Sequence, residues 1–214
     1  MPDHLIVIRS APTDYEVQGR VRGSLDVPPC PAGLAEAGSL ATRLAATPLA
    51  GVYAAPSTCA LETARIVAAA HGLQPRSVEL LANLDLGLWQ GKLVAEVRRQ
   101  QPRVYRQWQD DPWSVVAPEG ETLEEARGRV EKALERIFKR HREGRVAVVV
   151  PAPLDALVRW LVSGEPLGDL WLPDPQRVAA VELPVAAQWQ PGGVAPTPPL
   201  GDATSAVPVG LSAR

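Results

Sequence analysis

An arginine and a serine directly follow the first apolar run of the chain, and together they suggest anion chemistry. Residues 5–8 read Leu-Ile-Val-Ile, which predicts a strand buried on both faces at the centre of a parallel sheet. Ligands collect at the carboxyl ends of such strands, so Arg9 and Ser10 lie where a site is expected. A serine hydroxyl becomes a nucleophile only beside a base.

Few other side chains could supply a base or a second nucleophile. The three histidines are His4, His71 and His141; the first begins a strand far from Ser10 and the others close helices, so we interpret them as surface or structural residues. Cys59 falls in the first turn of a helix, where the dipole favours a thiolate, so a reactive thiol and an inert cysteine both remain open. The two cysteines form no disulfide framework, and no spacing suggests zinc.

The elements that must position these groups alternate between strands and helices. Strands are predicted at residues 5–8, 51–55, 77–81, 146–150, 177–183 and 185–189. Helices are predicted at 32–46, at 57–72 with Gly72 as its end, and at 154–161. Another helical region is predicted within 94–113, where two prolines break it. A long helix is predicted to start at a capping box formed by residues 122–125. Residues 11–31 are predicted as a surface loop, and residues 84–91 as a loop that contains Trp89. Trp89 and Trp108 fit either a ligand pocket or the core.

Length, composition and charge bound the class of protein. With 214 residues, 46% of them hydrophobic, the chain is expected to form one α/β domain over residues 1–190. Residues 191–214 are rich in Pro, Gly and Ala and are predicted to be a disordered tail. A net charge of −2 favours neither nucleic acid nor membrane partners. Because no signal segment or long apolar run is found, we expect a cytoplasmic protein.

Several short strings follow one another in a fixed order. They are Arg9 at a strand end, Gly19-Arg20-x-x-Gly23-x-Leu25-Asp26-Val27-Pro28, Glu62-Thr63-Ala64, Leu84-Asp85-x-Gly87-x-Trp89-x-Gly91 and Glu119-Gly120-Glu121-Thr122. Over residues 5–183 these strings resemble the histidine phosphatase superfamily, in its phosphoglycerate-mutase-like branch. The resemblance implies a three-layer α/β/α sandwich with a mostly parallel central sheet. It also implies phosphoryl transfer through a phosphohistidine, with no metal or nucleotide cofactor.

The site that the resemblance implies is degenerate here. The first arginine remains as Arg9, but the position of the nucleophilic histidine holds Ser10. The second arginine position holds Cys59, the general-acid glutamate position holds Asn83, and the second histidine position holds Ala152. An amide cannot protonate a leaving group, and loss of a general acid typically removes about 10²–10⁴-fold in rate.

The surroundings of these positions also disfavour a bound phosphate. Pro151 and Pro153 have no N–H to offer an anion at a helix start. Asp155 in the same turn suits the helix dipole but would repel phosphate. Arg9 either forms a residual anion site with Ser10 or pairs with a carboxylate such as Asp26 or Asp85.

Three hypotheses follow. The first, which we favour, is a catalytically inactive, pseudophosphatase-like protein with a binding or regulatory role. The second is an active phosphoric monoester hydrolase or phosphomutase that uses non-standard residues such as Ser10 and Arg9. The third is a thiol enzyme built on Cys59. The partner is expected to be a phosphorylated small molecule or a protein.

Overall fold

A central sheet of six strands organises the chain. The computed structural model describes residues 1–171, 180–187, 189–193 and 207–208. The strand order is β3-β2-β4-β1-β5-β6, with bounds β1 His4–Arg9, β2 Gly51–Ala54, β3 Arg76–Ser77, β4 Arg145–Val150, β5 Ala180–Pro184 and β6 Val207–Pro208. The first four strands in this order pair in parallel, whereas β5 and β6 are antiparallel additions. The predicted mostly parallel α/β sheet is confirmed.

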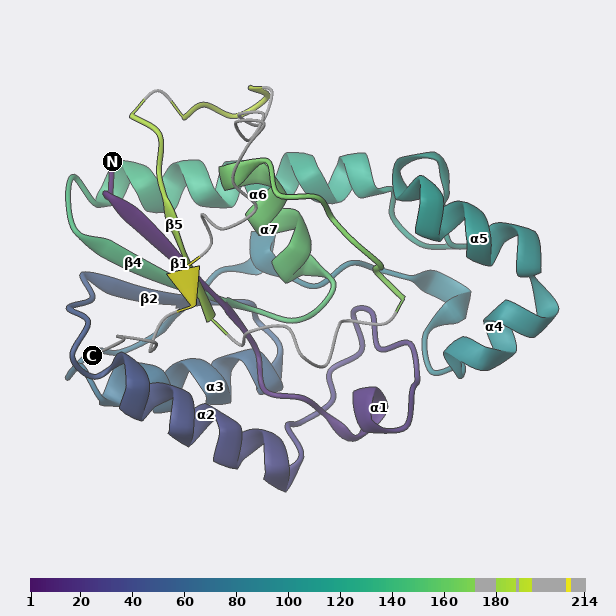
Figure 1. The fold of residues 1–214 in the computed structure, drawn as a ribbon, viewed down its shortest axis with the longest axis horizontal. Helices are drawn as coiled ribbons and strands as arrows, with labels where there is room; N and C mark the ends of the chain where they lie inside the picture. The colour runs from purple at the N-terminus through teal and green to yellow at the C-terminus, as the bar shows by residue number, and fades with distance from the viewer. Residues whose placement is uncertain (172–179, 188, 194–206, 209–214) are drawn as a thin grey trace.

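Helices cover both faces of the sheet and make three layers (Figure 1). One layer holds α2 (Pro31–Leu44) and α3 (Thr58–Ala69), and the other holds α6 (Leu123–Arg140) and α7 (Leu154–Ser163). The shorter helices are α1 (Asp14–Val17), α4 (Val94–Gln100), α5 (Pro102–Asp110) and the 3-10 turns η1 (Glu79–Leu81), η2 (Gly87–Trp89) and η3 (Pro112–Ser114). No helix in the described part of the chain is long and apolar enough to cross a membrane.

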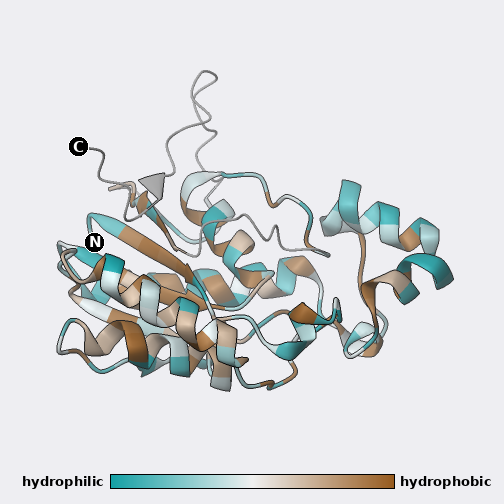
Figure 2. Ribbon diagram, turned by 60° about the horizontal axis from the view of Figure 1, so that its bottom comes forward, coloured by the Kyte–Doolittle hydropathy of each residue, from teal (hydrophilic) through white to brown (hydrophobic). Residues whose placement is uncertain are grey.

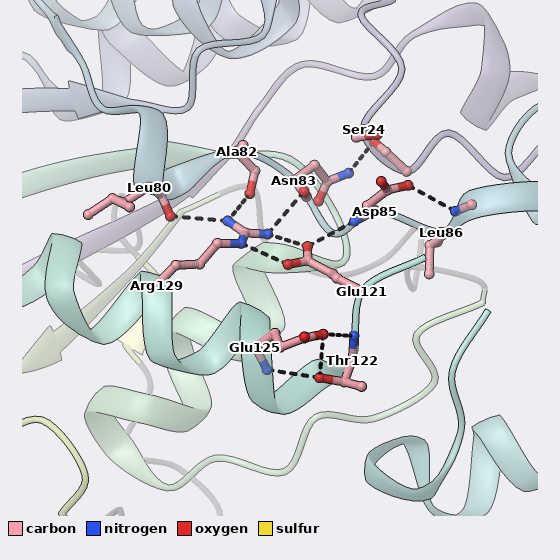
Figure 3. Close-up of polar contacts among 12 residues, drawn as sticks. Ser24, Leu80, Ala82, Asn83, Asp85, Leu86, Glu121, Thr122, Glu125 and Arg129 are labelled. Carbon is pink, nitrogen blue, oxygen red and sulfur yellow. Dashed lines mark hydrogen bonds and ion pairs between the residues drawn. The ribbon is translucent and has the colours of Figure 1, made fainter. Parts of the chain in front are cut away.

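The pattern of buried residues explains why these elements form. The apolar residues of β1 and β4 are fully buried because helices pack on both faces of these central strands. The helix α6 begins at the predicted capping box, in which the Thr122 hydroxyl accepts a bond from the Glu125 amide at 3.0 Å and the Glu125 carboxylate accepts one from the Thr122 amide at 2.8 Å (Figure 3).

An aromatic cluster fixes α5 to the body of the molecule. Trp89 and Trp108 are each 1% exposed and meet edge to face, with ring centroids 5.8 Å apart. Trp171 packs on both rings and on Tyr105. The alternative that Trp89 and Trp108 belong to the core is therefore the correct one.

Three predicted elements differ in the structure. The outer strand predicted at 77–81 is present as the edge strand β3 but is too long in the prediction, because β3 ends at Ser77 and a 3-10 turn follows that buries Leu81. The strand predicted at 185–189 is wrong in its described residues, which form a turn with the Trp189 amide bonded to the Ala186 carbonyl at 2.9 Å. The region 11–31, predicted as a surface loop, contains α1 and buries Val21.

Some predictions fall on residues outside the described ranges. Residues 177–179 of the predicted last strand belong to this group, so β5 is described only from Ala180. Most of the predicted disordered tail, residues 191–214, also lies outside, although its described residues 207–208 form β6 and pair with β5. For the rest of the tail, disorder stays a prediction.

Candidate functional site

The carboxyl edge of the sheet brings the predicted site positions together. Ser10 leaves β1 beside the end of β4, and its amide donates to the Val150 carbonyl at 2.8 Å. The Ser10 hydroxyl lies 3.6 Å from the Cys59 sulfur, in the first turn of α3. The Asn83 amide nitrogen donates to the Ala152 carbonyl at 2.9 Å. At this edge Ser10 thus meets Cys59, and Asn83 meets Ala152.

A second arginine, which the sequence reasoning did not select, occupies the centre of this group. Arg22 is 5% exposed and donates to the Cys59 sulfur at 2.9 Å. Its other terminal nitrogen lies 3.1 Å from a Glu16 carboxylate oxygen. A buried guanidinium needs such a partner, since an unpaired buried charge is costly.

The loop that carries Arg22 is held in place by backbone bonds and a glycine. The Val21 amide donates to the Lys92 carbonyl at 2.9 Å. Gly23 has a φ of +58°, and a Cβ there would lie 2.1 Å from a side-chain oxygen of Gln90. This is a backbone conformation that glycine adopts at little cost. In the sequence, the glycines on either side of Arg22, Gly19 and Gly23, were the signal that could have predicted a buried side chain held by an ordered loop, in place of a solvent-exposed one.

The first arginine faces a carboxylate as well. The Arg9 Nε donates to an Asp155 carboxylate oxygen at 3.2 Å. Asp155 is 4% exposed in the first turn of α7 and also lies 3.6 Å from a nitrogen of Arg159. Pairing of Arg9 with Asp26 or Asp85, as considered from the sequence, is not what the structure shows.

Those two carboxylates have other roles. Asp26 accepts bonds from the Thr58 amide at 2.7 Å and the Thr58 hydroxyl at 2.9 Å, and so caps the start of α3. Asp85 accepts a bond from the Gly87 amide at 2.9 Å and closes a local turn. Both are structural acceptors.

Asn83 is fixed by both its side chain and its backbone. The side-chain nitrogen donates to the Gly23 carbonyl at 2.8 Å as well as to that of Ala152. Because both partners are carbonyls, the nitrogen and oxygen of this amide are assigned without ambiguity. Asn83 therefore links the loop after β1 to the segment after β4.

An arginine of α6 holds the segment that carries Asn83 (Figure 3). Arg129 donates to the carbonyls of Leu80 and Asn83, each at 3.1 Å, and to that of Ala82. It also forms a two-nitrogen ion pair with Glu121, whose carboxylate accepts the Asp85 amide at 2.9 Å. This network lies where the outer strand predicted at 77–81 was expected to continue beyond Ser77.

A small cavity opens beside these groups. Its volume is about 170 Å³, which corresponds to a few water molecules. Arg22, Asp26, Ser57 and Asn83 are among the residues that line it. The lining contains both signs of charge and neutral hydrogen-bonding groups.

The three histidines lie elsewhere in the fold. His4 begins β1 and faces Glu182 at 3.7 Å, and His71 follows the far end of α3. The Nε2 of His141 lies 2.8 Å from the Tyr53 hydroxyl, near the start of β2. Burial lowers the pKa of both His71 and His141, and for His141 the nearby Arg76 and Arg140 lower it further. None is positioned to act on Ser10.

Metal ligands do not gather at this edge. Within the described residues, no group of three or more His, Cys, Asp or Glu side chains is arranged to hold a metal ion. The site must therefore be interpreted from its two arginines, their carboxylates, one serine, one cysteine and one asparagine.

Solved structures share this fold. The Bacillus stearothermophilus protein YhfR is 26% identical, with a TM-score of 0.73, and the match covers 87% of this chain and 96% of that one. A mycobacterial glucosyl-3-phosphoglycerate phosphatase, solved with VO3, is 22% identical with a TM-score of 0.75 and coverage of 84% and 92%. At that identity the second likeness supports the fold alone.

Curated sequences carry the relationship further. Phosphoserine phosphatase 1 of Hydrogenobacter thermophilus is 33% identical over 145 residues, which cover 68% of this chain and 69% of the relative. Phosphoglycerate mutase-like protein 4 of Arabidopsis thaliana is 31% identical over 152 residues, covering 68% and 64%. Residues 5–186 match the model of the histidine phosphatase superfamily (branch 1), and the chain therefore belongs to that superfamily.

Proposed function

We propose that this chain is a catalytically inactive histidine-phosphatase-like protein with a binding or regulatory role. The observation that carries the proposal is the set of side chains that meet at the carboxyl edge: Ser10, Cys59, Asn83 and two arginines that each face a carboxylate. Such a set offers no imidazole to accept a phosphoryl group and no free acid to protonate its leaving oxygen.

The nucleophile is the first missing component. The polar side chain bonded to the Ser10 hydroxyl is that of Cys59, at 3.6 Å. Among the described residues no carboxylate or imidazole forms a hydrogen bond with that hydroxyl. A serine without a base is a poor nucleophile at neutral pH. The covalent route of phosphoryl transfer therefore has no starting group.

The proton donor is the second missing component. Both bonds of the Asn83 side-chain nitrogen go to backbone carbonyls, and an amide has no acidic proton to give. Glu16 is the other candidate, but its oxygens already face the Arg22 guanidinium and the amide and hydroxyl of Thr13. Its carboxylate is thus engaged as an acceptor.

Binding of the phosphate itself is also opposed. Asp155 faces Arg9 and Glu16 faces Arg22, so each guanidinium already has a negative partner that a phosphate dianion would have to displace. The prolines at positions 151 and 153 withhold two backbone donors. A residual anion site at Arg9 and Ser10 stays a prediction, and these carboxylates weigh against it.

An active phosphatase or phosphomutase is the alternative. The names of relatives favour it, since one is a phosphoserine phosphatase that is 33% identical. In this version Ser10 would be the nucleophile, with Arg9 binding the phosphate. A thiol enzyme is a weaker alternative, because Cys59 is 1% exposed.

Turnover of an aryl phosphate and of phosphoserine, measured beside an active member of the superfamily, tests the proposal. We expect no turnover above buffer and no phosphorylated residue by mass spectrometry after acid-free quenching. Ser10→Ala and its matched control Ser57→Ala, which removes the other hydroxyl near Cys59 at 3.5 Å, should both leave this null result unchanged. Turnover that Ser10→Ala abolishes and Ser57→Ala retains would establish the phosphatase, and turnover lost only on thiol alkylation would establish the thiol enzyme.

A further inference from the structure

The helices α4 and α5 carry positive charge that the candidate site does not use. Together the two helices hold four arginines and two carboxylates, Glu96 and Asp110, although the whole chain has a net charge of −2. The four arginines are exposed, and we call them the arginine cluster: Arg98, Arg99, Arg103 and Arg106. Within the described ranges none of the four forms an ion pair with a carboxylate. Figure 2 shows both helices projecting from the sheet with hydrophilic outer faces.

The base beneath the arginine cluster is rigid. Tyr105 and Trp108 of α5 are buried against Trp89 and Trp171. The indole N–H of Trp171 donates to the Tyr105 carbonyl at 3.1 Å. A charged surface on such a base loses little backbone entropy when a partner binds, which favours recognition.

The stability of α5 itself does not explain where its charges lie. Arg103 stands in the first turn and Asp110 is the last residue, so a cation is at the positive end of the helix dipole and an anion at the negative end. The long helix α6 has the opposite and favourable arrangement, with acidic residues in its first turn and basic residues in its last. This placement of charges in α5 is slightly unfavourable for the helix, so helix stability does not account for it.

We propose that the arginine cluster docks an acidic segment of a protein partner, a short run of Asp and Glu residues. Guanidinium groups bind carboxylates through paired hydrogen bonds, which gives such a surface its selectivity. The nine residues of α5 span about 14 Å, a length suited to a short peptide segment. A nucleic acid duplex would extend onto the rest of the chain, where carboxylates outnumber cations. The inference gives the proposed binding role a partner class and rests on that role.

Fluorescence anisotropy with labelled poly-L-glutamate of about 20 residues tests the docking surface. The test variant replaces all four arginines of the cluster with Glu. The control variant makes the same change in net charge at four exposed cations on α2, α3 and α6, namely Arg43, Arg65, Lys132 and Arg136. At about 50 mM salt we expect at least tenfold weaker binding in the test variant and less than about threefold weakening in the control. Raising the salt to about 300 mM should weaken binding to the unaltered chain.

Several results would overturn the inference. Equal weakening in both variants would mean that only net charge matters, and absence of salt-sensitive binding would mean that no acidic segment docks. Tighter binding of a 20-base-pair duplex than of poly-L-glutamate would assign the cluster to nucleic acid. A second variant with Gln at the four positions, and thermal melts of all variants, separate lost docking from lost folding.

The same preparations distinguish this inference from the proposed function. Phosphatase turnover together with intact docking would refute only the inactive function. Absence of both turnover and docking would refute only the docking surface.

Discussion

Replacing Arg129 with methionine should destabilise the protein strongly, because this one side chain holds the segment behind the candidate site. Its guanidinium donates to three backbone carbonyls, those of Leu80, Ala82 and Asn83, and pairs with Glu121 (Figure 3). Methionine keeps most of the aliphatic volume and removes every donor. The variant therefore isolates the polar contribution.

The expected size of the effect follows from the contacts. Removing one partner of a buried, hydrogen-bonded ion pair typically costs about 3–5 kcal/mol. The side chains of Arg129 and Glu121 are each 19% exposed, so water can partly replace the lost bonds and we expect about 2–4 kcal/mol. For a chain of 214 residues this lowers the Tm by roughly 5–15 °C.

Arg127→Met is the matched control, since Arg127 lies on the same helix and has a similar exposure. Its ion-pair partners Glu131 and Glu124 are on α6 itself. Its guanidinium also lies over the Trp160 ring of α7, 5.5 Å from the ring centroid, whereas Arg129 donates to three backbone carbonyls of another segment. We expect a loss of about 1–1.5 kcal/mol from the ion pairs and the cation–π contact together.

Urea unfolding of both variants, followed by far-UV circular dichroism, measures the two losses at an unchanged m-value. Hydrogen exchange of the Asp85 amide, which donates to the Glu121 carboxylate at 2.9 Å, should become faster only in Arg129→Met. If the two variants lose the same stability, Arg129 is an ordinary surface residue and the reasoning about the segment fails.

Three further predictions concern stability and pH. Thr122→Ala should cost about 1 kcal/mol because it removes the capping bond to the Glu125 amide, whereas Thr122→Ser should cost much less in the same urea assay; equal losses would exclude the cap as the cause. Burial lowers the pKa of His71 and His141 below 6.5, so the unfolded chain takes up more protons than the folded chain as the pH falls. The Tm should therefore decrease from pH 7.5 to 5.5. Changing both histidines to Gln should flatten this dependence of Tm on pH, and an equally steep dependence in the double variant would refute the assignment. Trp171→Ala should cost about 3–5 kcal/mol by opening a cavity in the aromatic cluster, and a thermal melt close to that of the unaltered chain would show that the cluster collapses without loss.

The central strands and the capped helix could be predicted because their signals are local. Residues 5–8 and 146–150 are apolar runs that only a doubly covered strand explains. Thr122 and Glu125 bond to each other across a single turn. The strand predicted at 77–81 ends at Ser77 because the chain then turns into η1, and the Leu80 carbonyl of this turn accepts a bond from Arg129, almost fifty residues later. No local pattern contains that information.

In the candidate site too, local signals could be predicted from the sequence and contacts between distant segments could not. The strand end and the short strings predicted Ser10, Cys59, Asn83 and Ala152 at one edge of the sheet. The structure joins them in two pairs, Ser10 with Cys59 and Asn83 with Ala152. Arg22 was missed because it lies in a loop rich in glycine and charge, which resembles a solvated segment. Its burial depends on Glu16 and Cys59, and both contacts need the folded loop. The contacts of Arg22 with residues of other segments therefore could not be predicted from the sequence.

The two carbonyl bonds of Asn83 make this position a structural crosslink as well as a place where an acid could stand. A carboxylate introduced there would have no hydrogen to offer to Gly23 or Ala152, and a protonated acid would have only one. A proton donor installed at residue 83 would therefore remove at least one of the two bonds that join the loop after β1 to the segment after β4. A side chain at position 83 can thus either donate both structural hydrogen bonds or act as an acid, but it cannot do both.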